Sequence, residues 1–162
     1  MSVTQREEHD LILNLIRRFA EALAALVNRE SITSEAAALA EASDELERVF
    51  EEEFGELHRR LVGVDASSAA AMLRPLPRLR AYVLLLGYRT LARAREEPPP
   101  PERAREATRA LELALLCRVG LLEVDASVEE LDRVVRALAS LPCVDTSRLP
   151  KPLADALPSS PP

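Results

Sequence analysis

The chain has 162 residues, which suits a single domain, and its formal net charge is −6. Aromatic residues make up only 3% of it and 4 residues are glycine, a composition that favours helices over sheets. The net acidity argues against a protein that binds nucleic acid with its whole surface. The 2 cysteines are too few for a disulfide framework and lack the spacing of a zinc site. The polar N-terminus, and an apolar run (residues 81–88) too short to span a membrane, predict a soluble, cytoplasmic protein.

The first predicted element is a long amphipathic helix over residues 5–29. Thr4 and Glu7 have the spacing of a capping box at its start. Apolar residues then recur every three or four positions, which places them on one face of a helix. A terminal helix with so wide an apolar face is the predicted surface for self-association as a homodimer.

A second long helix is predicted over residues 35–61. Its apolar positions predict an inner face made of Leu39, Leu46, Val49, Phe50, Leu57 and Leu61. The opposite face carries a run of acidic residues between 41 and 53. We interpret this acidic face as a solvated surface, with a docking site for a basic partner as the alternative.

Shorter helices and a proline-rich tail are predicted for the rest of the chain. The predicted helices cover residues 67–73, 77–95, 101–123 and 127–140. Ser127 and Glu130 form a second capping-box pattern, and with Asp125 they are expected to begin the last helix. Six of the 12 prolines lie in residues 142–162, so we expect an extended or disordered tail with at most one helical turn, at 152–157. The predicted architecture is an all-α, single-domain array of five to six helices over residues 1–141, followed by this tail.

The stretch EEPPPPERA, residues 96–104, separates two strong helix patterns. A residue that precedes proline is pushed out of the helical conformation, whereas proline is well suited to the first position of a helix. The break is also only about five residues long, and such short connections usually join antiparallel helices. We therefore predict the corner of an antiparallel hairpin. A polyproline ligand and an interdomain linker are the alternatives.

This hairpin resembles a degenerate tetratricopeptide repeat. The residues LLLGY at 84–88 are similar to the first helix of that repeat, and AREATRALEL at 104–113 is similar to the end of its second helix. The loop is longer than in the repeat and is filled with proline, and no second copy follows at the expected period of about 34 residues. The resemblance implies a helical hairpin rather than a solenoid.

A wider resemblance covers residues 9–140. It follows the order of a DLILNLIRRFAEALAAL helix, an LVGVD junction at 61–65, a hairpin that ends in RALELAL, and a final SVEELDRVVRAL helix. In this order the chain is similar to a family of small, uncharacterised bacterial helical proteins with tetratricopeptide-like hairpins. That resemblance implies no particular activity and no functional residues.

The sequence shows no arrangement of residues that predicts catalysis. The 2 histidines, His9 and His58, lack the Glu-x-x-His spacing of a di-iron helical bundle. Cys117 lies in an apolar helix pattern, and no histidine lies near it in the sequence to act as a catalytic base. We therefore expect Cys117 to be a buried side chain that behaves as a small hydrophobic residue. The glycines are scattered and form no phosphate-binding loop. We predict a protein that is not an enzyme and has no cofactor, metal or catalytic residue.

The helix predicted over 77–95 carries two apolar stripes on roughly opposite faces. The second stripe is made of Arg80, Leu84, Tyr88, Leu91 and Arg95. One interpretation is that both stripes are core, with the arginine side chains extending outward. The other is that the second stripe lines a groove for an acidic or amphipathic segment of a partner protein, with Tyr88 as the anchor and the two arginines as charge clamps.

The predicted function follows from the second interpretation: a non-catalytic adaptor or scaffold that binds a protein partner. Residues 74–109 hold nine arginines and four glutamates, a net charge of +5. This excess keeps open an alternative, weak binding of nucleic acid or another acidic ligand through the arginine-rich hairpin. The absence of lysine and the scarcity of aromatic residues in this region argue against nucleic acid.

Overall fold

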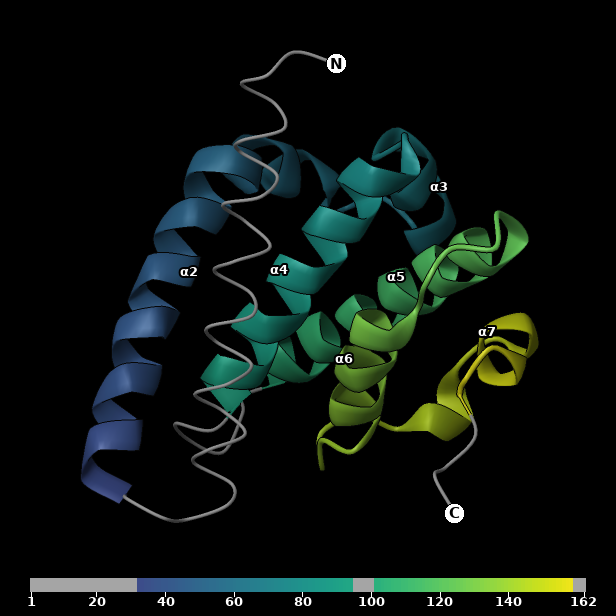
Figure 1. Ribbon diagram of the computed structural model, residues 1–162. Helices are drawn as coiled ribbons and strands as arrows, with labels where there is room; N and C mark the ends of the chain where they lie inside the picture. The colour runs from purple at the N-terminus through teal and green to yellow at the C-terminus, as the bar shows by residue number, and fades with distance from the viewer. Residues whose placement is uncertain (1–31, 95–100, 159–162) are drawn as a thin grey trace. The chain divides into compact units, whose positions relative to one another are not determined.

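The computed structural model of the protein describes residues 32–94 and 101–158 (Figure 1). The predicted helix over 5–29, its capping box and most of the proline corner lie outside the described residues. The helices, in chain order, are α2 (Ile32–Leu61), α3 (Ala66–Met72), α4 (Leu76–Ala94), α5 (Pro101–Glu123), α6 (Glu129–Ala139) and α7 (Lys151–Asp155), with a short 3₁₀-helix η1 (Thr146–Arg148) before α7. The all-α prediction is confirmed, since the described residues contain no strand.

The chain divides into two compact units, with the boundary between Arg59 and Arg60. In unit 1 the described element is α2, which begins three residues earlier than predicted. Its inner face is buried at Leu46, Val49, Phe50 and Phe54. Of these, Phe54 was not predicted, and the predicted Leu57 is only half-buried.

The acidic side of α2 is exposed, as the solvated-face interpretation expects. Glu51, Glu52 and Glu53 all lie on the surface. Glu52 forms an ion pair one turn from Arg48, at 3.2 Å. Exposed pairs of this kind contribute at most about 1 kcal/mol, so this ion pair adds little to the stability of α2.

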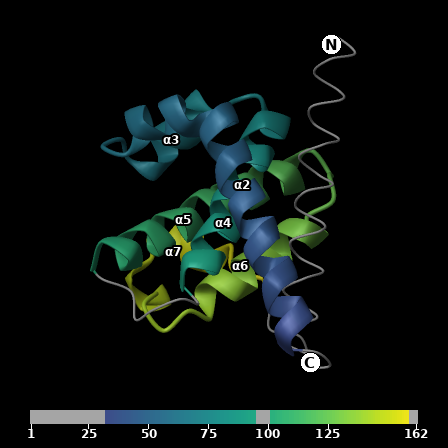
Figure 2. The same cartoon turned by 90° about the vertical axis from the view of Figure 1, so that its left-hand side faces the viewer.

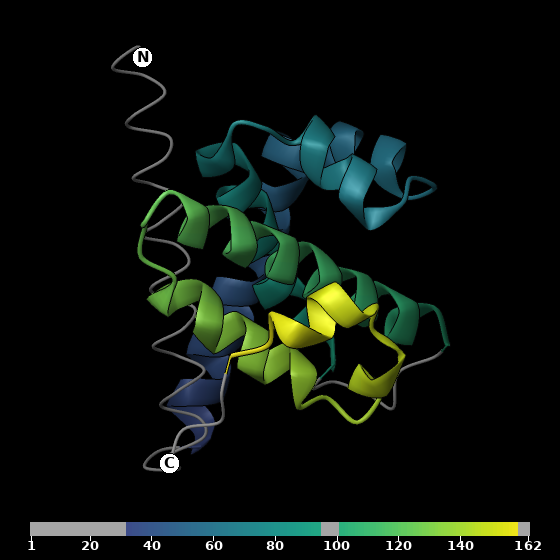
Figure 3. The ribbon, with the colours of Figure 1, turned by 90° about the vertical axis from the view of Figure 1, so that its right-hand side faces the viewer.

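Unit 2 is built on the hairpin of α4 and α5. The start of α4 meets the end of α5: a Leu76 side-chain carbon lies 2.8 Å from the position that a Cβ on Gly120 would occupy. The two helices are therefore antiparallel, as the proline corner predicted. α5 is the central helix of this unit, because it packs against α3, α4, α6 and α7 (Figures 2 and 3).

Local hydrogen bonds explain where the shorter helices begin. The Asp65 carboxylate accepts a hydrogen bond from the backbone N–H of Ser68 at 3.0 Å and so caps α3. At α6 the predicted capping box is wrong: the helix begins at Glu129, after Val128, without a side-chain cap. Acidic residues in the first turn of α6 offset the positive end of its dipole instead.

The expected role of Asp125 at the start of α6 is also wrong, because this residue closes α5. Its φ of 57° is left-handed, and its N–H donates to the carbonyl of Leu122. The N–H of Ala126 donates to the carbonyl of Leu121 at 2.9 Å. This pair of bonds is the Schellman motif, in which the left-handed residue is usually glycine and which ends a helix firmly.

The proline-rich tail differs from the expected extended or disordered segment. Val144, Leu149 and Leu153 are buried, and the yellow segment that carries them crosses α5 in Figure 3. Pro150 precedes α7 and another proline lies in its first turn, where the missing N–H costs no helical hydrogen bond. The helical turn predicted at 152–157 is thus present as α7, shifted by one to two residues, and the prolines mark its start.

Candidate functional site

The predicted partner-binding stripe on α4 is largely buried. Leu84, Tyr88 and Leu91 are all at most 6% exposed. The Tyr88 hydroxyl donates to Oε1 of Glu130 on α6 at 2.7 Å, and burial raises its pKa. These residues do not line an open groove, so the interpretation of the stripe as core describes the structure. Arg95 lies outside the described residues.

A close approach of α6 to α4 explains this burial. A Cβ on Gly87, one residue before Tyr88, would collide with the Val134 side chain of α6. Glycine at this position lets the two helix backbones come together over the stripe. Periodicity in the sequence identified the stripe as apolar but did not show which element covers it.

Arginines without a partner gather instead at the start of α4. Arg74, Arg78 and Arg80 make no hydrogen bond or ion pair to any described part of the chain, and Nε of Arg80 is buried. Burial raises the pKa of the Cys117 thiol to about 11, and the charges of Arg80 and Arg74 both oppose this rise. Both guanidinium groups therefore lie within electrostatic range of the same point on α5. Elsewhere in unit 2, Arg109, Arg118 and Arg133 pair with an acid or a carbonyl, whereas Arg105 and Arg136 stand singly without a partner among the described residues.

Exposed apolar side chains lie at this same end of unit 2, where α4 begins and α5 ends. Met72 is 52% exposed at the end of α3, and Val119 and Leu122 are 37% and 49% exposed on neighbouring turns of α5. Val124, just after α5, is 61% exposed. We call this end, with Arg74, Arg78, Arg80 and these four apolar residues, the basic end of unit 2. Both Figure 1 and Figure 3 show the start of α4 and the end of α5 on the same side of the unit.

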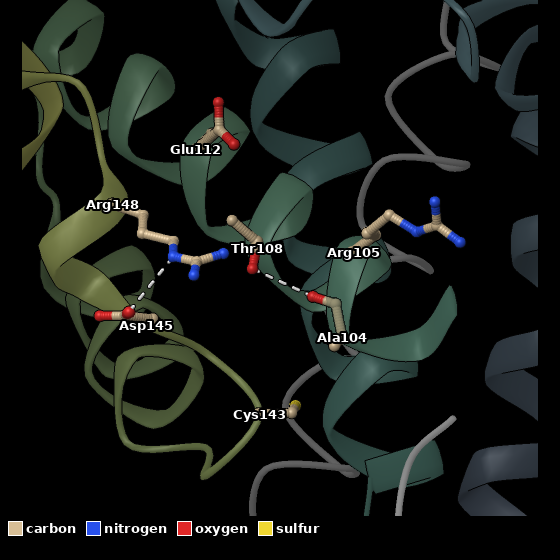
Figure 4. Close-up of a pocket in the computed structure, with 7 residues that line it drawn as sticks. All are labelled: Ala104, Arg105, Thr108, Glu112, Cys143, Asp145 and Arg148. Carbon is tan, nitrogen blue, oxygen red and sulfur yellow. Dashed lines mark hydrogen bonds and ion pairs between the residues drawn. The ribbon is translucent and has the colours of Figure 1, made fainter. Parts of the chain in front are cut away.

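A pocket of about 340 Å³ lies between α5 and the C-terminal segment, away from the basic end (Figure 4). From α5 it is lined by Ala104, Arg105, Thr108 and Glu112, and from the C-terminal segment by Cys143, Asp145 and Arg148. Residues four apart on a helix share a face, so three of the α5 residues form one stripe along the pocket. In Figure 4 the Arg148 side chain extends toward Thr108, whereas the Arg105 side chain points away from Thr108 and Arg148.

The polar groups of this pocket are unequally satisfied. Asp145 accepts hydrogen bonds from the backbone and hydroxyl of Ser147, and its carboxylate lies 3.5 Å from Nε of Arg148. Thr108 donates to the carbonyl of Ala104 at 3.0 Å, which leaves its oxygen as an acceptor. Glu112 has no hydrogen bond or ion pair within the described residues although it is half-buried. Desolvation raises its pKa, and the nearby charge of Arg109 opposes the rise.

Sequence reasoning missed this pocket. Ala104, Thr108 and Glu112 follow a helical spacing that is common on any amphipathic helix. The other wall comes from residues 143–148, which were assigned to an extended or disordered tail. The pocket therefore depends on long-range packing of the tail on α5, for which the sequence carries no local signal.

The structure also bears on the predictions about Cys117, metal sites and membrane spans. Cys117 is fully buried, as expected of a cysteine that acts as a small hydrophobe. Over residues 32–94 and 101–158, no group of three or more His, Cys, Asp or Glu side chains has the arrangement of a metal site. No helix within that same part of the chain is long and apolar enough to cross a membrane.

No family model matches the chain, and no curated protein or solved structure is significantly similar to it. The resemblance to a bacterial helical family with tetratricopeptide-like hairpins therefore stays a prediction.

Proposed function

We propose that this chain is a non-catalytic helical adaptor that binds an acidic, amphipathic segment of a partner protein with the basic end of unit 2. The observation that carries the proposal is the set of three unpaired arginines, Arg74, Arg78 and Arg80, at the start of α4. Arginine pairs strongly with carboxylates because its planar group donates two parallel hydrogen bonds.

The exposed apolar residues at the same end support a protein segment as the occupant. Val119 and Leu122 are three residues apart on α5 and therefore neighbours on its surface. Apolar side chains that stay exposed beside charged ones are typical of protein–protein interfaces, where the apolar part supplies affinity and the charges supply orientation. A segment with acids on one side and apolar residues on the other matches both features.

The experiment compares capture of proteins from a lysate of the source organism by the wild-type chain and by two variants. The double variant Arg74→Glu, Arg78→Glu reverses the charge of the proposed surface, and Arg136→Glu is a matched control on exposed α6. We expect one partner to be captured by wild type and by the control but lost from the double variant. Crosslinking should place its acidic segment beside the start of α4. Circular dichroism checks that all three chains keep the same helix content.

The same experiment separates the alternative function. If capture by wild type is abolished by nuclease and falls steeply with salt, the arginines bind nucleic acid rather than a protein. If the double variant captures the same proteins as wild type, the basic end is not the binding surface and the proposal is wrong.

A further inference from the structure

We propose that the pocket between α5 and the C-terminal segment binds a small zwitterionic ligand of amino-acid or dipeptide size, with its cationic group on Glu112 and its carboxylate on Arg148. This site is independent of the basic end and of the partner proposed for it. The pocket is formed by two segments more than 30 positions apart in the chain, and its volume of about 340 Å³ is at the small end of ligand pockets.

Glu112 defines the cationic half of the ligand. A half-buried carboxylate loses part of its hydration, and that loss is costly unless a donor replaces the water. No described residue donates to Glu112. The charge of Arg109 opposes the raised pKa of Glu112, but the guanidinium of Arg109 donates its hydrogen bond to the carbonyl of Leu61, at 2.6 Å. An ammonium group in the pocket would supply the missing donor.

Arg148 defines the anionic half. Its side chain is 86% exposed and its contact with Asp145 is long, at 3.5 Å, so this pair contributes little and leaves donors free. Asp145 is also satisfied by Ser147 without Arg148. In Figure 4 the guanidinium of Arg148 lies between Asp145 and Thr108, and Glu112 lines the same pocket one turn further along α5. A carboxylate would therefore meet Arg148 while a cation on the same ligand meets Glu112.

The apolar parts of the wall suit the link between the two charges. Ala104, the methyl group of Thr108 and Cys143 contribute few polar groups to the lining. A short hydrocarbon chain between an ammonium and a carboxylate fits this arrangement. A ligand with two like charges would pair with only one of Glu112 and Arg148.

The test uses three probes of equal chain length: 6-aminohexanoate, which carries both charges, hexylamine, which carries the cation, and hexanoate, which carries the anion. Each is titrated into the full chain up to about 20 mM, a range that detects dissociation constants near 1 mM. The readout is the chemical shift of backbone amides in two-dimensional NMR. We expect saturable shifts at the lining residues with 6-aminohexanoate, and binding at least about fivefold weaker for either singly charged probe, a loss of about 1 kcal/mol.

Two variants and a control assign the roles. Glu112→Gln should weaken 6-aminohexanoate and hexylamine by about tenfold without affecting hexanoate. Arg148→Gln should weaken 6-aminohexanoate and hexanoate but not hexylamine. Glu123→Gln, an exposed glutamate at the end of the same helix, should change nothing.

The proposal is overturned if no probe gives a saturable shift or if the shifts lie away from the pocket. It is also overturned if Glu112→Gln binds 6-aminohexanoate as wild type does. Both glutamate variants are checked by their amide spectra, so a loss of binding through unfolding is recognised directly. Failure of this site leaves the adaptor proposal unaffected, because the two surfaces share no residue.

Discussion

A single glycine sets the distance between two helices of unit 2. Gly87 on α4 lies against Val134 of α6, and an added methyl group would collide with that β-branched side chain. Valine has one strongly preferred rotamer in a helix, so it cannot move aside easily. The hydrogen bond between Tyr88 and Glu130 depends on the same approach.

We therefore predict that Gly87→Ala destabilises the protein by about 1–3 kcal/mol through overpacking, although alanine alone would favour the helix by up to about 1 kcal/mol. Urea unfolding followed by circular dichroism measures the change. Gly63→Ala is the matched control, because no atom lies within 4 Å of a Cβ there and stability should be kept or slightly raised. Equal stability of Gly87→Ala and wild type would contradict the packing of α6 on α4.

The helices of unit 2 differ in how their N-terminal ends are capped. α3 has only seven residues and depends on the Asp65 carboxylate for its first turn. The hydrogen bond from the Ser68 backbone lowers the pKa of Asp65 below its usual value of 3.8. A carboxyl with a lowered folded-state pKa stabilises the fold fully above its unfolded pKa, and this stabilisation is lost as the pH falls through the folded pKa.

Accordingly, Asp65→Ala should lower the urea midpoint at pH 7, and the gap from wild type should shrink as the pH falls below about 3.8. Ser127→Ala is the comparison at α6. It removes the hydroxyl of the predicted capping box and should leave the midpoint unchanged, because α6 has no side-chain cap. A large loss of stability in Ser127→Ala would show that Ser127 does cap α6. A difference in midpoint between Asp65→Ala and wild type that stays constant with pH would show that the Asp65 carboxylate does not cap α3.

At the scale of the molecule, the C-terminal segment is part of the fold of unit 2. Arg118 of α5 donates to Asp132 on α6 at 2.7 Å and to the carbonyl of Ala156 at 3.0 Å. Arg118 thus connects α5 both to α6 and to the segment that follows α7. Leu149 and Leu153 are buried in the same segment.

Removing residues 144–162 should therefore lower the stability of the whole chain. Each large aliphatic side chain contributes about 1.5–3 kcal/mol when fully buried, less the conformational entropy that the segment regains when it is freed. We expect a lower urea midpoint. We also expect the free energy of unfolding to fall less steeply with urea concentration, because the shorter chain exposes less surface when it unfolds. A chain that lacks only residues 159–162 is the comparison. If both truncated chains unfold alike, residues 144–158 do not stabilise unit 2.

The sequence by itself determined the all-α class and the antiparallel α4–α5 hairpin. These depend on local physics: the helical spacing of apolar residues, a composition poor in glycine and aromatics, and proline at the ends of helices. The predicted range 101–123 agrees with α5 for this reason, since Pro101 is well suited to open a helix.

Only the tertiary structure decided what covers each apolar face. The stripe through Leu84 and Tyr88 is equally apolar in a groove and in a core, and the approach of α6 at Gly87 made it core. The tail folds back because burial of Leu149 and Leu153 outweighs the low helix propensity of a proline-rich segment, and this return creates the pocket beside Glu112. Such contacts join residues far apart in the chain, and their free energy comes from shape and burial that no local pattern encodes.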